Sequence, residues 1–265
     1  MTLTLHFVIY TVASLPSNEG SMEIQFLGTG DAFGSGGRFN TCFHVRDQSG
    51  AFLVDCGASS MIAIRKFGVD PNAIRAILIT HLHGDHFGGL PFFILDAQLF
   101  SRRAAPLIIA GPPGLRARLA AAMENFFPGS SKVEQRFALD IRELAPRHTH
   151  DIAGIAVTPF VVKHACGAPP FALRLAADDK TLCYSGDTEW VDGLREAAQG
   201  VDVFIAETYF FDKAVKFHLD FATLARHLPD LGAKRVILTH MSPDMLARAA
   251  QTGCEVADDG MVITV

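Results

Sequence analysis

One short stretch limits what this chain can fold into more than any other. Residues 76–89 read Ala-Ile-Leu-Ile-Thr-His-Leu-His-Gly-Asp-His-Phe-Gly-Gly, an apolar, β-branched run that ends in three histidines and an aspartate within six positions. So many ionisable groups at the end of a buried-strand pattern need a common reason. The stretch therefore predicts a strand that delivers its last side chains to a metal site.

The spacing within this loop predicts how its side chains are shared. An extended backbone places residues i and i+2 on the same face, so His81 and His83 can point at one ion. Gly84 is expected to let the chain turn, after which Asp85 and His86 are free to aim at a second ion. Nitrogen and oxygen ligands without cysteine suit Zn²⁺, with Mn²⁺ or Fe²⁺ as competitors.

Later apolar runs repeat this pattern, because each ends in a residue that could bind a metal or move a proton. These residues are His164, Asp187, Glu207 and His240. We expect them to converge, since the ends of neighbouring strands gather at one edge of a sheet. Taken singly, each could instead be an ordinary cap or turn residue.

Two further polar positions need separate interpretations. Asp55 follows an earlier strand pattern, and it is predicted either to orient a ligand histidine or to cap the next helix. The pair His148 and His150 has the spacing of the metal loop, but no buried strand precedes it. We therefore expect an exposed loop there.

The composition indicates one large globular unit. The 265 residues are 49% hydrophobic, which is enough to bury an α/β core. The five cysteines lie far apart without Cys-x-x-Cys spacing, so free thiols and a cytoplasmic location are expected. A formal net charge of −5 argues against an extended nucleic-acid footprint.

The beginning of the chain differs from the rest. Its apolar character is that of a signal peptide, but it lacks a positively charged start and is too short to span a bilayer. We expect an N-terminal extension over residues 1–21, one domain over residues 22–265, and no membrane association. Met22 directly precedes the first alternating strand pattern and is a candidate natural start.

Together these motifs resemble those of the metallo-β-lactamase fold superfamily over residues 22–265. The resemblance implies a four-layer αββα sandwich and two Zn²⁺ ions, with Mn²⁺ or Fe²⁺ possible. It also implies seven metal ligands: His81, His83 and His164 for one ion, Asp85, His86 and His240 for the other, and Asp187 bridging the two. Room would remain between the ions for a hydroxide, oriented by Asp85, that attacks the substrate.

The resemblance is to the ribonuclease Z-like branch in particular. An aspartate at the bridging position departs from the cysteine-containing zinc β-lactamases. In that branch a glutamate follows a strand and a histidine precedes the last ligand, as Glu207 and His218 do here. This implies that Glu207 orients His218 as the proton donor to the leaving group. Alternatively, His218 merely begins the helix that Asp220 caps.

Substrate size follows from what separates two of these motifs. The tRNA-processing enzymes of this branch carry a long basic arm, which in the bacterial type lies between the third-motif histidine and the bridging aspartate. Here only a short strand-turn-strand separates His164 from Asp187. We therefore predict a dinuclear-metal phosphodiesterase acting on a small anionic phosphodiester, such as a cyclic nucleotide.

Other functions remain open at this point. One alternative is a carboxylic ester, thioester or lactone hydrolase on the same metals, although glyoxalase II-type thioesterases carry a helical C-terminal domain. Another is a tRNA 3′-processing endoribonuclease. A metal-binding regulatory module is the non-enzymatic alternative. Dimerisation with a second copy is suggested by the family resemblance.

Overall fold

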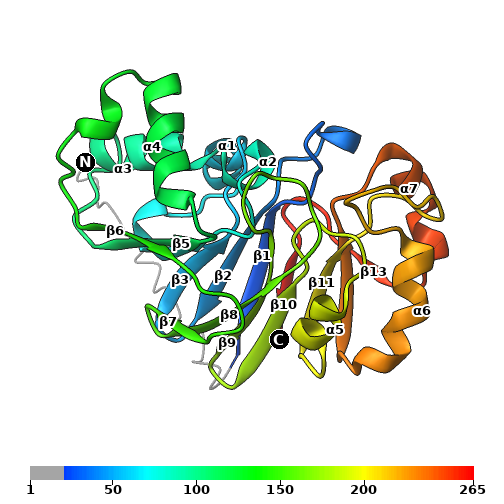
Figure 1. Cartoon of the computed structure of the whole chain (residues 1–265). Coiled ribbons are helices and arrows are strands. Elements are labelled where there is room, and N and C mark those ends of the chain that lie inside the picture. The colour runs from blue at the N-terminus through cyan, green and yellow to red at the C-terminus, as the bar shows by residue number, and fades with distance from the viewer. Residues whose placement is uncertain (1–20) are drawn as a thin grey trace, which may run out of the picture.

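The structure, a computed structural model, describes residues 21–265. In this part of the chain two seven-stranded sheets lie face to face, and helices cover both outer faces (Figure 1). The expected N-terminal extension, residues 1–21, lies outside the described residues apart from Ser21. No helix of the described part is long and apolar enough to cross a membrane.

The first sheet joins the strands of the N-terminal half to the last strand of the chain, in the order β14-β1-β2-β3-β4-β5-β6. Its strands are β1 (Glu23–Gly28), β2 (Cys42–Asp47), β3 (Gly50–Val54), β4 (Ile74–Leu78), β5 (Leu107–Gly111), β6 (Leu139–Glu143) and β14 (Val262–Thr264). Three helices pack on its outer face: α1 (Ser60–Lys66), α3 (Leu90–Leu99) and α4 (Leu115–Phe126). There Ile77 of β4 and Ile109 of β5 share a buried core with Ile64 and Phe93 of the helices.

The second sheet has the order β13-β12-β11-β10-β9-β8-β7. Its strands are β7 (His150–Ile152), β8 (Ile155–Val161), β9 (Phe171–Ala177), β10 (Lys180–Tyr184), β11 (Val203–Glu207), β12 (Arg235–Thr239) and β13 (Glu255–Val256). Its outer face carries α5 (Asp192–Ala198), α6 (Phe221–Leu231) and α7 (Pro243–Arg248). The one-turn helix α2 (Gly84–Phe87) and short 3₁₀ turns complete the described elements: η1 (Ser35–Gly37), η2 (Pro71–Ala73), η3 (Ser130–Lys132) and η4 (Ala249–Gln251).

The inner faces of the two sheets share a third, central core. Phe43 of the first sheet makes edge contacts with Phe26 and, across the layer, with Tyr184, at ring-centroid distances of 5.2 and 4.9 Å. All five residues of β11 are buried, as expected for a parallel strand covered on both faces. The predicted four-layer αββα sandwich is therefore confirmed.

The direction of the strands decides where the functional side chains lie. β10, β11 and β12 are parallel, so the ends of these strands, Tyr184, Glu207 and Thr239, lie at the same edge. β8 runs the same way, because β9 is antiparallel to both β8 and β10. The segment after β4 joins this edge from the other sheet, since the Phe171 N–H donates to the carbonyl of Thr80 at 3.0 Å.

Two local expectations need correction. The apolar run predicted to end at His164 leaves the sheet earlier, at Val161, because Lys163 pairs instead with Glu189 of the loop after β10. His148 is exposed as expected, but His150 opens β7 and is not a loop residue. It pairs with Val157, because the edge of β8 still offers free backbone hydrogen-bonding groups.

Candidate metal centre

The metal loop is wedged against a second backbone segment. β4 is followed by a short extended stretch and the one-turn helix α2 (Gly84–Phe87). The Cys56 N–H donates to the carbonyl of His86 at 2.7 Å. A Cβ on Gly57 would lie 2.1 Å from the carbonyl oxygen of Asp85, so this approach requires glycine. The loop is thus held by main-chain contacts as well as by its own turn.

The turn at Gly84 does not depend on glycine, contrary to the sequence expectation. Its φ angle is not positive, and a Cβ there would meet no heavy atom within 4 Å. The turn is made by α2 itself, because the N–H groups of His86 and Phe87 both donate to the carbonyl of His83, at 3.1 and 2.9 Å.

Three histidines form a first group of candidate ligands. In His81, His83 and His164, one ring nitrogen from each lies within 4.8 Å of the others. His81 is fully buried, and Nδ1 of His83 faces Nε2 of His164 at 2.9 Å. Three imidazole nitrogens converging on one point provide a set of the kind that Zn²⁺ prefers.

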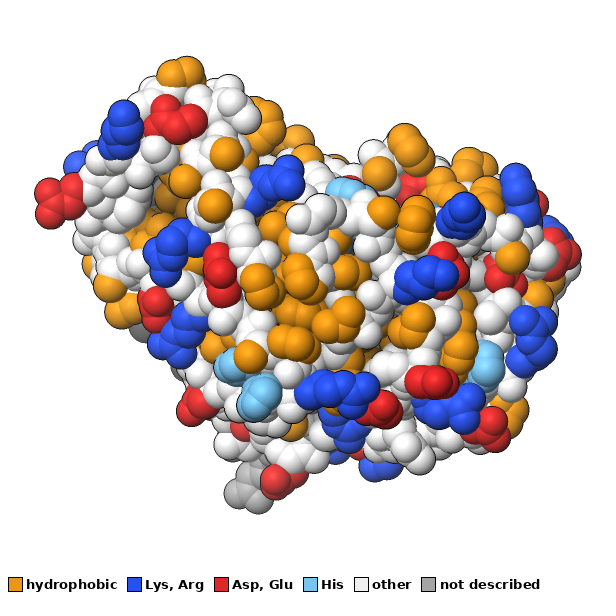
Figure 2. All heavy atoms as spheres, in the orientation of Figure 1, with side chains coloured by type: hydrophobic (Ala, Val, Ile, Leu, Met, Phe, Trp, Pro, Cys, Tyr) orange, Lys and Arg blue, Asp and Glu red, His pale blue; other side chains and the backbone are white. Residues whose placement is uncertain are grey.

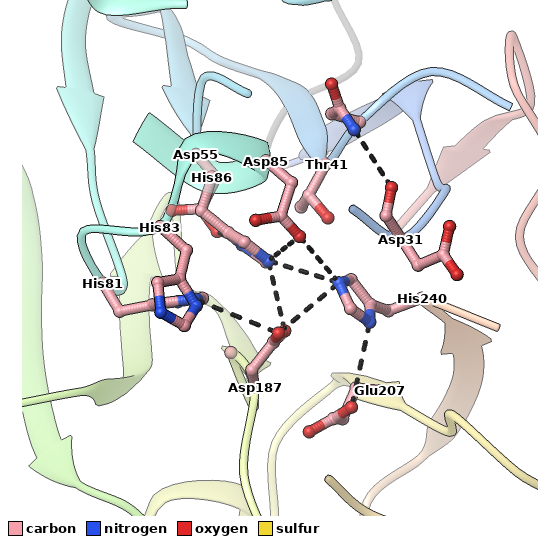
Figure 3. Close-up of polar contacts among 12 residues, drawn as sticks. Asp31, Thr41, Asp55, His81, His83, Asp85, His86, Asp187, Glu207 and His240 are labelled. Atoms are coloured by element: carbon pink, nitrogen blue, oxygen red, sulfur yellow. Dashed lines mark hydrogen bonds and ion pairs between the residues drawn. The ribbon is translucent and has the colours of Figure 1, made fainter. Parts of the chain in front are cut away.

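A second group lies beside the first and contains the carboxylates of Asp85 and Asp187. Asp85, His86, Asp187 and His240 also place candidate ligand atoms within 4.8 Å of one another. Nε2 of His240 lies 3.2 Å from Oδ2 of Asp85 and 3.3 Å from Nε2 of His86 (Figure 3). Together the two groups contain the seven residues that the family resemblance implies as metal ligands.

Asp187 lies between the two groups. Its Oδ1 is 3.2 Å from Nε2 of His86, and its Oδ2 is 3.5 Å from Nε2 of His240. The same Oδ2 is 3.9 Å from Nε2 of His81 (Figure 3), and it is also 3.9 Å from Nε2 of His164. The carboxylate of Asp187 thus lies within 3.9 Å of two imidazoles from each group, as a bridging ligand would.

Other groups fix the orientation of the histidine rings. Asp55 accepts from Nδ1 of His86 at 2.7 Å, and its other oxygen accepts from the Thr80 N–H at 2.8 Å. The sequence predicts that Asp55 either orients a ligand histidine or caps a helix, and its contact with His86 supports the orienting role. Nδ1 of His164 donates to the carbonyl of Phe217 at 2.8 Å. In both rings Nε2 is left to face the centre.

Burial and charge indicate that this cluster is built for cations. Within the described structure, Nε2 of His81 is buried without a hydrogen-bond partner. Burial, followed by the nearby charge of His86, lowers the pKa of His81 well below its usual value. Although burial opposes them, the carboxylates of Asp187 and Asp85 raise the pKa of His240 to about 9. A neutral imidazole with a free nitrogen beside clustered carboxylates fits divalent metal ions.

Glu207 and His218 form a pair at the edge of this cluster. Nδ1 of His218 lies 3.0 Å from Oε2 of the fully buried Glu207. Asp220 caps α6 through the Thr223 N–H at 2.8 Å, so the cap does not involve the imidazole of His218. His218 also lies within 4.8 Å of ligand atoms of His164 and Asp187, so it could itself serve as a ligand.

The cluster forms the floor of a cavity of about 200 Å³. Its lining residues are Ala32, Phe33, His83, Asp85, His164, Asp187, Tyr209, His218 and His240. The ring of Tyr209 stacks on His218 at 4.7 Å. Figure 2 shows one face of the molecule, on which a histidine lies beside hydrophobic side chains near the upper edge.

Sequence reasoning missed the aromatic wall of this cavity. Phe33 lies in the glycine-rich loop after β1, and Tyr209 lies two residues beyond Glu207. The position of Tyr209 beside a predicted site residue was a usable signal. For Phe33 no local signal existed, because the loop reaches the cavity only when the two sheets stack.

Comparison with known proteins agrees with the fold and the site. A family model described as Anti-Pycsar protein Apyc1 matches residues 22–259. A ribonuclease Z of Methanothermobacter thermautotrophicus is 28% identical over 301 residues, covering 92% of this chain and 97% of that protein. The alignment is longer than the present chain, so the relative carries inserted segments.

Solved structures show the same architecture. The short form of human tRNase Z superposes with a TM-score of 0.75 at 27% identity, covering 91% of this chain and 98% of that one. The metallo-β-lactamase fold protein YhfI from Bacillus subtilis gives a TM-score of 0.74 at 19% identity, covering 92% and 100%. The predicted relationship to ribonuclease Z-like proteins of the metallo-β-lactamase fold is confirmed.

Proposed function

The chain belongs to the family of the Anti-Pycsar protein Apyc1, and we propose that it hydrolyses a small phosphodiester, with a cyclic nucleotide as the candidate substrate. It is a metal-dependent hydrolase of phosphodiester bonds, related to ribonuclease Z. The observation that carries the proposal is the position of Asp187 between two groups of candidate ligands at the floor of a small cavity.

We assign the ligands as the sequence predicted: His81, His83 and His164 for one ion, Asp85, His86 and His240 for the other, and Asp187 for both. Bound ions, which we propose to be Zn²⁺ with Mn²⁺ or Fe²⁺ as competitors, would supply positive charge that stabilises the phosphoryl oxygens and acidifies water.

The remaining polar groups have roles of their own in this proposal. Asp85 accepts a hydrogen bond from the attacking water and so orients it. His218 donates a proton to the leaving oxygen. Oε2 of Glu207 accepts a hydrogen bond from Nδ1 of His218 at 3.0 Å, and this leaves Nε2 of His218 free to donate to the leaving oxygen. Because Glu207 is fully buried, its carboxylate cannot exchange this partner for water.

The size of the cavity supports a small substrate. About 200 Å³ is less than the volume of a typical pocket for a drug-sized ligand, roughly 300 Å³ or more. The net charge of −5 also gives no general attraction to a polynucleotide. A second candidate function is tRNA 3′ processing, which the names of the ribonuclease Z relatives favour and which would require a larger contact surface.

The test is a substrate panel assayed with metal-replete protein. We expect turnover of cyclic nucleotides and of bis(p-nitrophenyl) phosphate, and little turnover of acyl-thioesters, p-nitrophenyl acetate or lactones. Faster cleavage of precursor tRNA than of any small diester would establish the second candidate instead. Faster cleavage of thioesters or lactones would overturn both.

Location and assembly complete the proposal. All five cysteines are free thiols, which supports the cytoplasm as the compartment. We also propose a homodimer on the basis of family resemblance, and light scattering coupled to size-exclusion chromatography would test it. The fractionation of the native protein would test the location.

A further inference from the structure

One side chain at the mouth of the metal cavity has no role in the function proposed above. Phe33 lines this cavity, yet 82% of its surface is exposed to solvent. It lies in the loop between β1 and η1, drawn in blue at the end of the sheets where α2 also lies (Figure 1). A phenyl ring can neither bind a metal ion nor transfer a proton, so it must act through its ring surface.

The loop that carries this ring has a fixed backbone. The carboxylate of Asp31 is 1% exposed and accepts from the N–H groups of Phe33 and Ser35, at 3.1 and 2.9 Å, and from the Ser35 hydroxyl at 2.7 Å. The side chain of Asn40 donates to the Asp31 carbonyl at 3.0 Å. Gly34, with φ of 68°, then turns the chain back. The backbone of Phe33 is therefore held beside the cavity.

The other aromatic side chain of the cavity is already occupied. Tyr209 stacks on His218 at 4.7 Å with an interplanar angle of 29°, so one face of its ring is covered. Phe33 has no such aromatic neighbour among residues 21–265. Of the two rings, Phe33 is therefore the one with neither face covered by an aromatic side chain of the described residues.

The position of the reacting group decides which part of a substrate could reach this ring. A phosphodiester bound at Asp187 places its phosphorus at the cavity floor, and the cavity of about 200 Å³ leaves the ester substituents at its mouth. A planar, apolar substituent would there cover the exposed phenyl face and release water from both surfaces. Stacking of a base on an aromatic side chain tolerates different bases, because every base has a π face.

We propose that Phe33 is a stacking platform that selects phosphodiesters carrying a planar aromatic group, such as a nucleobase, on the ester substituent that stays bound to phosphorus. This deepens the proposed function and rests on it. Phe33 is here a residue of substrate specificity, since it lies outside both candidate ligand groups.

Two substrates with the same leaving group test the proposal. Thymidine 5′-p-nitrophenyl phosphate carries a base on the retained side, whereas methyl p-nitrophenyl phosphate does not. In Phe33→Ala, kcat/KM for the thymidine ester should fall about tenfold, and that for the methyl ester less than about twofold. Phe33→Tyr should retain the preference, because it keeps the ring.

The controls separate this inference from the function itself. Phe100→Ala removes a ring that is 76% exposed but does not line the cavity, and it should leave both substrates unaffected. Metal content should be unchanged in all three variants. Equal loss for both substrates, or no loss, in Phe33→Ala would overturn the stacking role while the phosphodiesterase remained. If the wild-type protein cleaved neither ester but cleaved thioesters, the proposed function and this inference would fall together.

Discussion

Nδ1 of His218 lies 3.0 Å from Oε2 of Glu207, although Glu207 ends a buried strand and His218 lies in the loop before α6. Burial, followed by the nearby charge of Asp187, raises the pKa of Glu207. Burial on its own would lower the pKa of His218, but the hydrogen bond to Glu207, together with the charges of Glu207 and Asp187, outweighs it, so the pKa of His218 is raised. A carboxylate on one ring nitrogen and an open cavity beyond the other are what a proton donor needs.

His218→Ala should therefore lower kcat by about 100-fold or more for a diester with an alkoxide leaving group. The loss should be much smaller for bis(p-nitrophenyl) phosphate, whose leaving group departs without a proton. Metal content should stay at the wild-type value, and loss of metal would identify His218 as a ligand. His227→Ala is the matched control, because His227 stacks on Trp190 outside the cavity.

Metal binding should distinguish two His-x-His pairs, His81 with His83 and His148 with His150. His81→Ala removes a buried candidate ligand, so it should lower both metal content and turnover, the latter by about 100-fold or more. His148→Ala alters an exposed ring whose Nδ1 contacts only the Pro146 carbonyl, and it should change neither. Elemental analysis of both purified variants provides the measurement. Wild-type metal content in His81→Ala would remove that residue from the ligand set.

Asp55 should control metal affinity without touching an ion. Asp55→Ala leaves Nδ1 of His86 without its acceptor at 2.7 Å, so the ring loses its orientation. We expect metal affinity to fall about 10- to 100-fold, measured by competition with a chromophoric chelator. Asp55→Asn keeps an acceptor oxygen and should lose less. An unchanged affinity in Asp55→Ala would contradict an orienting role.

The close approach at Gly57 should make this position intolerant of any side chain. A Cβ there would lie 2.1 Å from the carbonyl of Asp85, so Gly57→Ala must displace the metal loop. We expect a loss of about 1–3 kcal/mol in unfolding free energy and weaker metal binding. Gly84→Ala is the control, because a Cβ there meets nothing within 4 Å. Thermal unfolding of both metal-free variants would reveal the difference.

A surface ion pair should make stability depend on pH far from the site. Lys234 donates to the carboxylate of Asp202 at 2.7 Å, and Thr181 also donates to it. These hydrogen bonds lower the pKa of Asp202 to about 2, because they outweigh partial burial, which would raise it. The folded pKa is below the unfolded value of 3.8, so the stabilisation is complete above that value and is lost as the pH falls through about 2.

The substitution Asp202→Asn tests this dependence. Because the pair is partly solvated, we expect wild type to exceed the variant by about 1 kcal/mol near neutral pH, with the difference shrinking as the solution is acidified below about pH 4. Urea unfolding of metal-free protein at several pH values measures both. A difference that is constant over this range would mean that the charge of Asp202 does not stabilise the fold.

Much of the candidate site could be read from local patterns. The alternation of apolar residues predicted the strands, and residues such as His240 and Asp187 stood out because a charged group ended a buried run. The expectation for Gly84 was wrong, since the turn is an ordinary helical one. The requirement at Gly57 was invisible, because it arises from a backbone that is 28 residues away in sequence.

By itself the sequence determined which side chains are available for metal binding and the order in which they occur. It also determined that they follow strands, because hydrophobic period and turn residues are properties of short segments. Only the tertiary structure decided that two groups of candidate ligands meet at Asp187, which nitrogen each ring presents, and that Phe33 lies at the mouth of the cavity. Those features depend on the order and direction of strands in two stacked sheets, and such long-range pairing is not encoded in any one segment.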